Sequence, residues 1–75
     1  MTKDEIWSIS YQRVCTFFRQ QEDVAEENPS VFLFRTCRIT LAELEPNKIG
    51  SWEIRRTRIH LEGENADVES IYHRF

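Results

Sequence analysis

Glycine, proline and cysteine are all scarce in this chain of 75 residues, which contains only two of each. With 40% hydrophobic residues, so little glycine and proline excludes a low-complexity or unstructured tail and indicates an ordinary globular domain. Two cysteines are too few for the disulfide framework of a small secreted protein. We therefore expect free, buried thiols, a reducing compartment and a cytoplasmic location.

Long apolar runs are missing as well. No segment approaches the roughly 20 consecutive apolar residues of a membrane-spanning helix, and the N-terminus does not resemble a signal peptide. We therefore expect no membrane partner. The length predicts one small domain, residues 1–75, and a lone domain of this size buries only about 60% of its unfolded surface. Nearly every large apolar residue is consequently expected in a core or an interface.

The net charge of −3 is unevenly distributed along the chain. Acidic residues outnumber basic ones in residues 1–30, whereas basic residues outnumber acidic ones in residues 35–60. Such a distribution favours attraction between neighbouring elements of one fold, with solvated flanks. The functional alternative is a basic sheet face that binds an anionic partner.

A long antiparallel hairpin is predicted for residues 31–61, where two segments rich in β-branched and aromatic residues flank a turn. The apolar residues change parity along the second segment, since Trp52 and Ile54 are even whereas Ile59 and Leu61 are odd. Side chains alternate with a period of two, so this change predicts an extra residue, a β-bulge, at Arg55–Arg56. The cross-strand neighbours would then be Leu41 with Ile54 and Cys37 with Ile59.

An N-terminal helix is predicted over residues 3–24. Thr2 and Glu5 have the spacing of a capping box, and the following apolar residues fit a period of 3.6 better than a period of two. The predicted helix carries an apolar stripe of Trp7, Tyr11, Val14, Cys15 and Phe18.

The C-terminal residues 67–75 fit either a short helix or a third strand. A two-stranded hairpin is marginal by itself, whereas three strands under a helix are viable, so we favour the strand. The predicted fold class is α+β, with one N-terminal helix packed on a three-stranded antiparallel β-meander (α-β-β-β). The alternative has a C-terminal helix in place of strand three.

One helix would cover one face of this sheet and leave the other face open. The predicted partner-binding residues are Phe32, Phe34, Arg38, Arg55, Arg58, His60, His73 and Phe75. Aromatic residues and arginine are enriched at protein interfaces, so the predicted function is a small non-enzymatic protein-interaction module, an inhibitor, adaptor or subunit, that binds a protein partner or itself. The alternative is an RNA- or single-strand-binding module that stacks bases on the same basic, aromatic face.

Catalytic, metal and cofactor sites are not predicted. Cys15, Cys37, His60 and His73 lack the short spacings of structural zinc ligands. On a single strand, Ser70 and His73 would lie on opposite faces, so they could not form a nucleophile–base pair. We therefore expect no catalytic residues, no cofactor, no metal and no small-molecule ligand.

Overall fold

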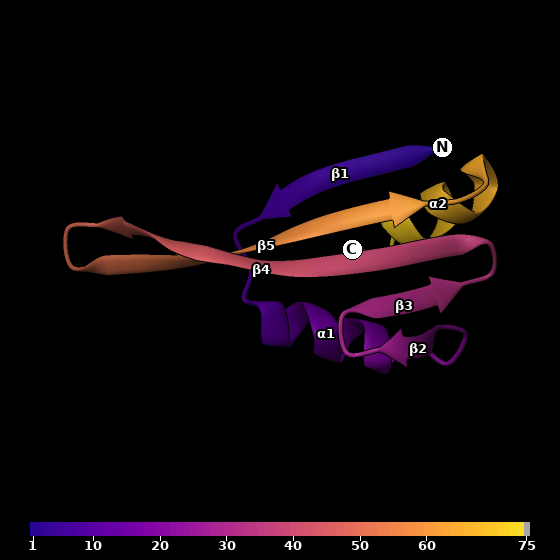
Figure 1. Cartoon of the computed structure of the whole chain (residues 1–75), viewed down its shortest axis with the longest axis horizontal. Helices are drawn as coiled ribbons and strands as arrows, with labels where there is room; N and C mark the ends of the chain where they lie inside the picture. Colours follow the sequence, from indigo (N-terminus) through magenta and orange to yellow (C-terminus); the bar gives the residue numbers. More distant parts are fainter. Residues whose placement is uncertain (75) are drawn as a thin grey trace.

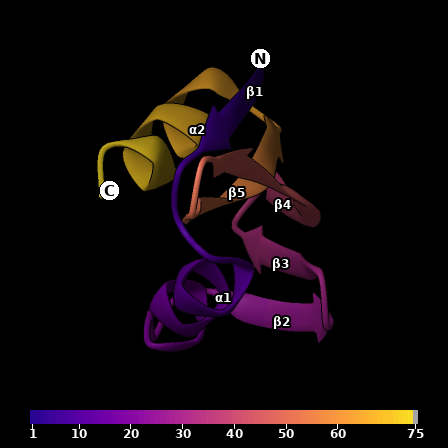
Figure 2. The same cartoon turned by 90° about the vertical axis from the view of Figure 1, so that its left-hand side faces the viewer.

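Five strands form one antiparallel sheet in the computed structural model, which describes residues 1–74, and both helices pack on the same face of that sheet (Figures 1 and 2). The elements are β1 (Thr2–Trp7), α1 (Tyr11–Arg19), β2 (Ala25–Asn28), β3 (Val31–Phe34), β4 (Cys37–Ile49), β5 (Trp52–Glu62) and α2 (Asn65–Tyr72). The spatial order of the strands is β1-β5-β4-β3-β2. The α+β class is confirmed, but the predicted three-stranded meander is wrong. Neither helix in residues 1–74 is long and apolar enough to cross a bilayer.

The N-terminal segment is a strand followed by a helix, not the continuous helix predicted over residues 3–24. β1 lies along β5 in antiparallel register, from Thr2 opposite Glu62 to Trp7 opposite Thr57. The helix begins after Ser10, whose side-chain oxygen accepts a hydrogen bond of 3.4 Å from the Arg13 amide. The capping box at Thr2 does not form, because these residues pair with β5 instead.

A tight turn at Arg35 and Thr36 divides the segment that the sequence pattern placed in one strand. Phe34 pairs with Cys37 across this turn, and Arg35 adopts a left-handed φ of 54°. The chain reversal moves Phe32 and Phe34 onto the same face as Cys37 and Ile39. Both phenylalanines are fully buried, so the prediction that they lie on an open face is wrong.

The long hairpin of β4 and β5 is confirmed, but its register differs from the prediction. Leu41 pairs with Ile59 and Ile39 pairs with Leu61, so Trp52 and Ile54 do not join the core. The bulge lies on β4 instead of β5, because the register shifts between Leu44 and Asn47, across from Arg55. Pro46 lies within this shift and has no N–H to donate, which makes it a favourable position for an interrupted ladder.

The C-terminal segment is the helix α2, so the predicted third strand is wrong. The edge of β5 that such a strand would occupy is already taken by β1. Gly63 connects β5 to α2 so closely to β3–β4 that an added Cβ would lie 2.7 Å from the Thr36 carbonyl oxygen. Val68 and Ile71 of α2 are fully buried against the sheet.

The core lies between the two helices and the covered face of the sheet (Figure 2). The rings of Phe18 from α1 and Phe32 from β3 are 5.5 Å apart, which joins the helix to the outer half of the sheet. The buried apolar residues are Val14, Cys15, Phe18, Phe32, Phe34, Cys37, Ile39, Leu41, Ile59, Leu61, Val68 and Ile71.

Candidate interaction surface

The far end of the β4–β5 hairpin projects beyond the rest of the sheet (Figure 1). β1 pairs with β5 only as far as Thr57, and β3 pairs with β4 only as far as Thr40. Residues 44–56, which we call the arm, therefore form a two-stranded ribbon. The ribbon turns at Gly50, which has a φ of 61°, and Ile49 pairs with Trp52 next to this turn. The arm accounts for the elongated shape of the molecule, whose principal extents are 42 × 22 × 19 Å.

The arm has an apolar face that nothing covers within residues 1–74. Cross-strand pairs place Ile49 beside Trp52 and Asn47 beside Ile54, and these four side chains share one face because residues opposite one another in an antiparallel pair point the same way. Trp52 is 77% exposed, Ile49 58% and Ile54 38%. An isolated two-stranded ribbon is marginal in water, and exposed apolar patches are typical of interaction sites, so the arm is the candidate surface.

The opposite face of the arm is charged. Lys48 pairs with Glu53, and Arg55 follows on the same face by alternation. The arm is therefore amphipathic, with no protein layer on its apolar side.

A side chain of β5 stabilises the bulge at the base of the arm. Arg56 lies opposite Leu44, and its Nη2 donates a hydrogen bond of 3.2 Å to the Glu45 carbonyl oxygen. The Nε of Arg56 is buried and has no hydrogen-bond partner among the described residues. This contact fixes the arm where the regular ladder is interrupted.

The uncovered face of the sheet continues from the arm into the body of the molecule. Asp4 of β1 accepts two hydrogen bonds from the Arg58 guanidinium of β5, the Nε bond being 2.9 Å long. This pairing lowers the pKa of Asp4 below its usual value. His60 Nδ1 lies 3.6 Å from the same carboxylate, and Ile6, beside Arg58, is 56% exposed. The body therefore presents a largely polar, internally paired surface.

Three of the predicted partner-binding residues lie together on this uncovered face: Arg38, Arg58 and His60. On β4, Thr40 lies opposite His60 and Ala42 lies opposite Arg58, and Arg38 is two residues before Thr40 on the same face. Arg55 lies on the charged face of the arm. His73 is exposed at the end of α2. Phe32 and Phe34 are in the core, and Phe75 lies outside the described residues.

Most arginines near the body pair with carboxylates. Arg74 makes two hydrogen bonds of 2.7 Å to Asp23, and Arg19 donates to Glu26 at 3.0 Å. The further pairs are Arg35 with Asp67, Arg38 with Glu27 and Arg58 with Asp4. The positive charge of the body is therefore largely compensated within the chain.

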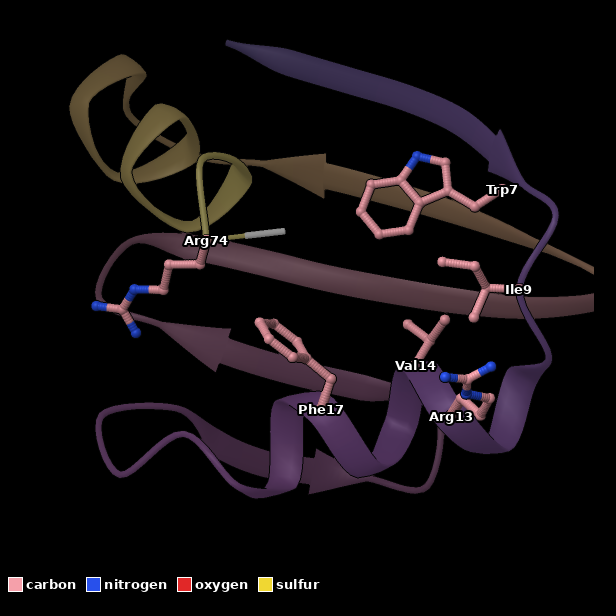
Figure 3. Close-up of a pocket in the computed structure, with 6 residues that line it drawn as sticks. All are labelled: Trp7, Ile9, Arg13, Val14, Phe17 and Arg74. Carbon is pink, nitrogen blue, oxygen red and sulfur yellow. The ribbon is translucent and has the colours of Figure 1, made fainter.

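A hollow of about 320 Å³ lies between α1, the end of β1 and the segment after α2 (Figure 3). Its lining is mainly apolar and consists of Trp7, Ile9, Arg13, Val14, Phe17 and Arg74. Trp7 and Phe17 are engaged in interactions of their own, and Arg74 is held by Asp23. The hollow is therefore the margin of the core, and we assign it no ligand.

Chemistry-bearing side chains do not gather in one place in residues 1–74. No group of three histidine, cysteine or acidic side chains there is arranged to hold a metal ion. Cys15 and Cys37 are both buried and unpaired, and burial raises the pKa of the Cys37 thiol. A buried neutral thiol is a poor nucleophile.

The sequence pattern missed the arm as a site, although a signal was present. The parity change between Trp52–Ile54 and Ile59–Leu61 marks the point where β5 leaves the body. Ile59 and Leu61 face the helices, whereas Trp52 and Ile54 face the uncovered side, because only the body has helices on which apolar residues can pack.

The chain matches no protein-family profile, and no curated protein is significantly similar to it. Its functional assignment therefore depends on the geometry of the arm and the sheet.

Proposed function

We propose that the protein is a small non-enzymatic protein-interaction module and that the arm is its recognition element. The observation that carries this proposal is the uncovered apolar face of the arm, formed by Ile49, Trp52 and Ile54. Tryptophan is among the residues most enriched at interface hot spots, and its large ring loses little conformational entropy on binding. The role would be that of an inhibitor, adaptor or subunit.

A protein fits this surface better than a nucleic acid does. A nucleic-acid site needs uncompensated positive charge along the backbone path. Arg38 and Arg58 are paired with Glu27 and Asp4, and the arm itself carries Glu45 and Glu53 beside its basic residues. The net charge of −3 would further oppose binding of a polyanion.

The experiment is site-specific photo-crosslinking in the source cell, with a benzophenone side chain replacing Trp52. The matched control carries the same probe at Glu22, which is exposed in the connection between α1 and β2. We expect a protein adduct from position 52 and none from position 22. Equal adducts from both positions, or none from either, would overturn the arm as the recognition element.

Nuclease treatment of the crosslinked sample distinguishes a protein partner from a nucleic-acid partner. An adduct at position 52 that survives nuclease and keeps its mass supports a protein partner. An adduct that nuclease removes, together with an affinity that falls steeply with salt concentration, would replace the proposal with the nucleic-acid alternative.

A further inference from the structure

Two free edges of the sheet contain neither a proline nor a bulge. They are the outer edge of β1 and the outer edge of Trp52–Arg56 in β5, and no strand of residues 1–74 pairs with either. The remaining edges carry such protection, at Pro46 in β4 and at the register shift of β2. An unprotected edge can accept a further strand, so both edges are candidate sites for an extended peptide.

β1 differs from the arm because a helix lies beside it. A hollow of about 490 Å³ lies between β1 and α2, and the described residues that line it are Lys3, Trp7, Glu69, Tyr72 and His73. The arm is a two-stranded ribbon, and no helix of residues 1–74 lies next to it (Figure 1). A peptide on β1 would therefore gain side-chain contacts in a groove in addition to backbone hydrogen bonds, and such contacts provide specificity.

The outward backbone groups of β1 follow from its ladder with β5. Met1 and Gly63 exchange both backbone hydrogen bonds, since the Met1 amine donates at 2.8 Å and the Gly63 amide at 3.2 Å. Along an antiparallel ladder, pairs that exchange both bonds alternate with pairs that exchange none. The odd-numbered residues of β1 therefore bond to β5, whereas Thr2, Asp4 and Ile6 direct their N–H and C=O groups toward the free edge.

The side chains of β1 on the α2 side determine the chemistry of the groove. They are Lys3, Glu5 and Trp7, since their partners in β5 are buried under the helices. The Lys3 ammonium lies 4.5 Å from the centre of the Tyr72 ring, and a hydrogen bond to Glu5 raises the pKa of the Tyr72 hydroxyl. Together with Glu69 of α2, these residues give the groove a net negative charge and an apolar end at Trp7.

We infer that the groove between β1 and α2 binds an extended segment of a partner protein, which adds to β1 as a further antiparallel strand. Antiparallel pairing continues the pattern of the whole sheet. The expected pattern, from N- to C-terminus, is apolar-apolar-basic-x-acidic. The two apolar residues would lie opposite Trp7 and the 56% exposed Ile6, the basic residue opposite Glu5, on the side of Glu69, and the acidic residue opposite Lys3. This site is separate from the arm, so it goes beyond the proposed function and does not depend on it.

A second copy of this chain fits the edge of β1 poorly. In a two-fold, antiparallel pairing of β1 with itself, the residue on the axis lies opposite itself. Whether the axis passes through Lys3, Asp4 or Glu5, a like-charge pair results, and like charges directly opposite each other are destabilising. The charge pattern therefore favours a different chain as the occupant.

The probe is the synthetic peptide Leu-Val-Arg-Thr-Glu-Thr with an acetylated N-terminus and an amidated C-terminus. Titration calorimetry with the full chain measures its affinity, and NMR follows amide hydrogen exchange. We expect saturable binding and slower exchange at the outward amides of Asp4 and Ile6. Exchange at Glu5 and Trp7 should change little, because these amides already bond to β5.

A matched pair of methylated peptides tests the strand geometry. N-methylation of the first threonine, opposite Asp4, replaces an N–H that would bond to β1, so affinity should fall about tenfold or more. N-methylation of the arginine, opposite Glu5, replaces an N–H that would point away from β1, so affinity should be unchanged. A second pair tests the charge: Glu69→Lys should weaken binding roughly tenfold, whereas Glu22→Lys, an equal charge change at an exposed distant position, should not.

Several outcomes would overturn the inference. They are no binding, equal losses from the two methylated peptides, and equal effects of the two charge variants. Slow exchange at Asp4 and Ile6 that needs no peptide and increases with protein concentration would assign the edge to a second copy instead. Trp52→Ser should bind the peptide like wild type, and a loss of affinity there would place the peptide on the arm.

Discussion

β5 passes through two different environments along its length. In the body, Thr57–Glu62 lies between β1 and β4, and its residues Ile59 and Leu61 are almost completely buried under the helices. In the arm, Trp52–Arg56 has one neighbour, and Trp52 is among the most exposed large side chains of the described chain. The two halves have similar composition, so neighbouring elements and not residue type decide which apolar side chains become core.

The same contrast predicts where the molecule is sensitive to substitution. Stability should depend on the body, because its apolar area is removed from water, whereas binding should depend on the arm, whose apolar area is still exposed. Two of the following experiments pair a body position with an arm position, and two change a body position alone.

The largest expected effect is the truncation of a buried phenylalanine. Phe34→Ala should lower the free energy of unfolding by about 3–5 kcal/mol, because it removes transfer free energy and leaves a cavity in a small core. That loss is enough to unfold a domain of marginal stability. Chemical denaturation followed by circular dichroism measures it. A loss comparable to that of an exposed site would contradict the burial of this ring.

The next experiment compares substitutions at the two glycines. Gly63→Ala would place a Cβ 2.7 Å from the backbone of Thr36 and Cys37, so we expect a loss of roughly 1–3 kcal/mol in global stability. Gly50→Ala meets no atom within 4 Å but must adopt a φ of 61°, which strains the arm turn by about 1–2 kcal/mol. Its effect should appear in amide hydrogen exchange of the arm and not in the melting temperature. Equal shifts of the melting temperature would show that arm and body unfold as one unit.

A smaller, pH-dependent effect is expected at Asp67. The Thr36 hydroxyl and amide donate to its carboxylate at 2.6 and 3.2 Å, and these hydrogen bonds lower the pKa of Asp67 below the usual value. A carboxyl with a lower pKa in the folded state adds stability above its unfolded pKa. That stability is lost as the pH falls through the folded value.

Asp67→Asn should therefore lower the melting temperature at neutral pH and reduce its dependence on acid. Melts of both proteins between pH of about 7 and about 2.5 test this prediction. Parallel curves for wild type and variant would show that Asp67 does not contribute to the acid sensitivity of the fold.

The sequence predicts correctly those elements whose formation depends mainly on residues close together in the chain. The helical period holds in residues 11–19, where Val14, Cys15 and Phe18 are buried, and the β4–β5 hairpin was predicted from its alternation and turn. The helix start was misplaced because Thr2 and Glu5 have the spacing of a cap, whereas Ser10 is the residue that caps it.

The errors came from contacts between distant residues. The turn at Arg35–Thr36 has neither glycine nor asparagine, and it is stabilised by Asp67, which is 31 positions away from Thr36. The third strand is predicted because a two-stranded hairpin is marginal by itself, but β1 already occupies the edge of β5 that this strand would need. Of the predicted site residues, Arg38, Arg58 and His60 share the uncovered face, but the exposed Trp52 is not among them.

The smallest expected effect on stability is that of Trp52→Ser, and it is the sharpest test of the contrast between arm and body. Because Trp52 is 77% exposed, its removal should change the free energy of unfolding by no more than about 0.5 kcal/mol. A tryptophan that supported the fold would cost several times more when truncated. The variant should therefore melt like wild type, while Trp7→Ser, at a half-buried position packed against the core, should melt well below it. If Trp52→Ser also melts well below wild type, the arm folds back onto apolar surface of its own chain, and its apolar face is core and not a binding surface.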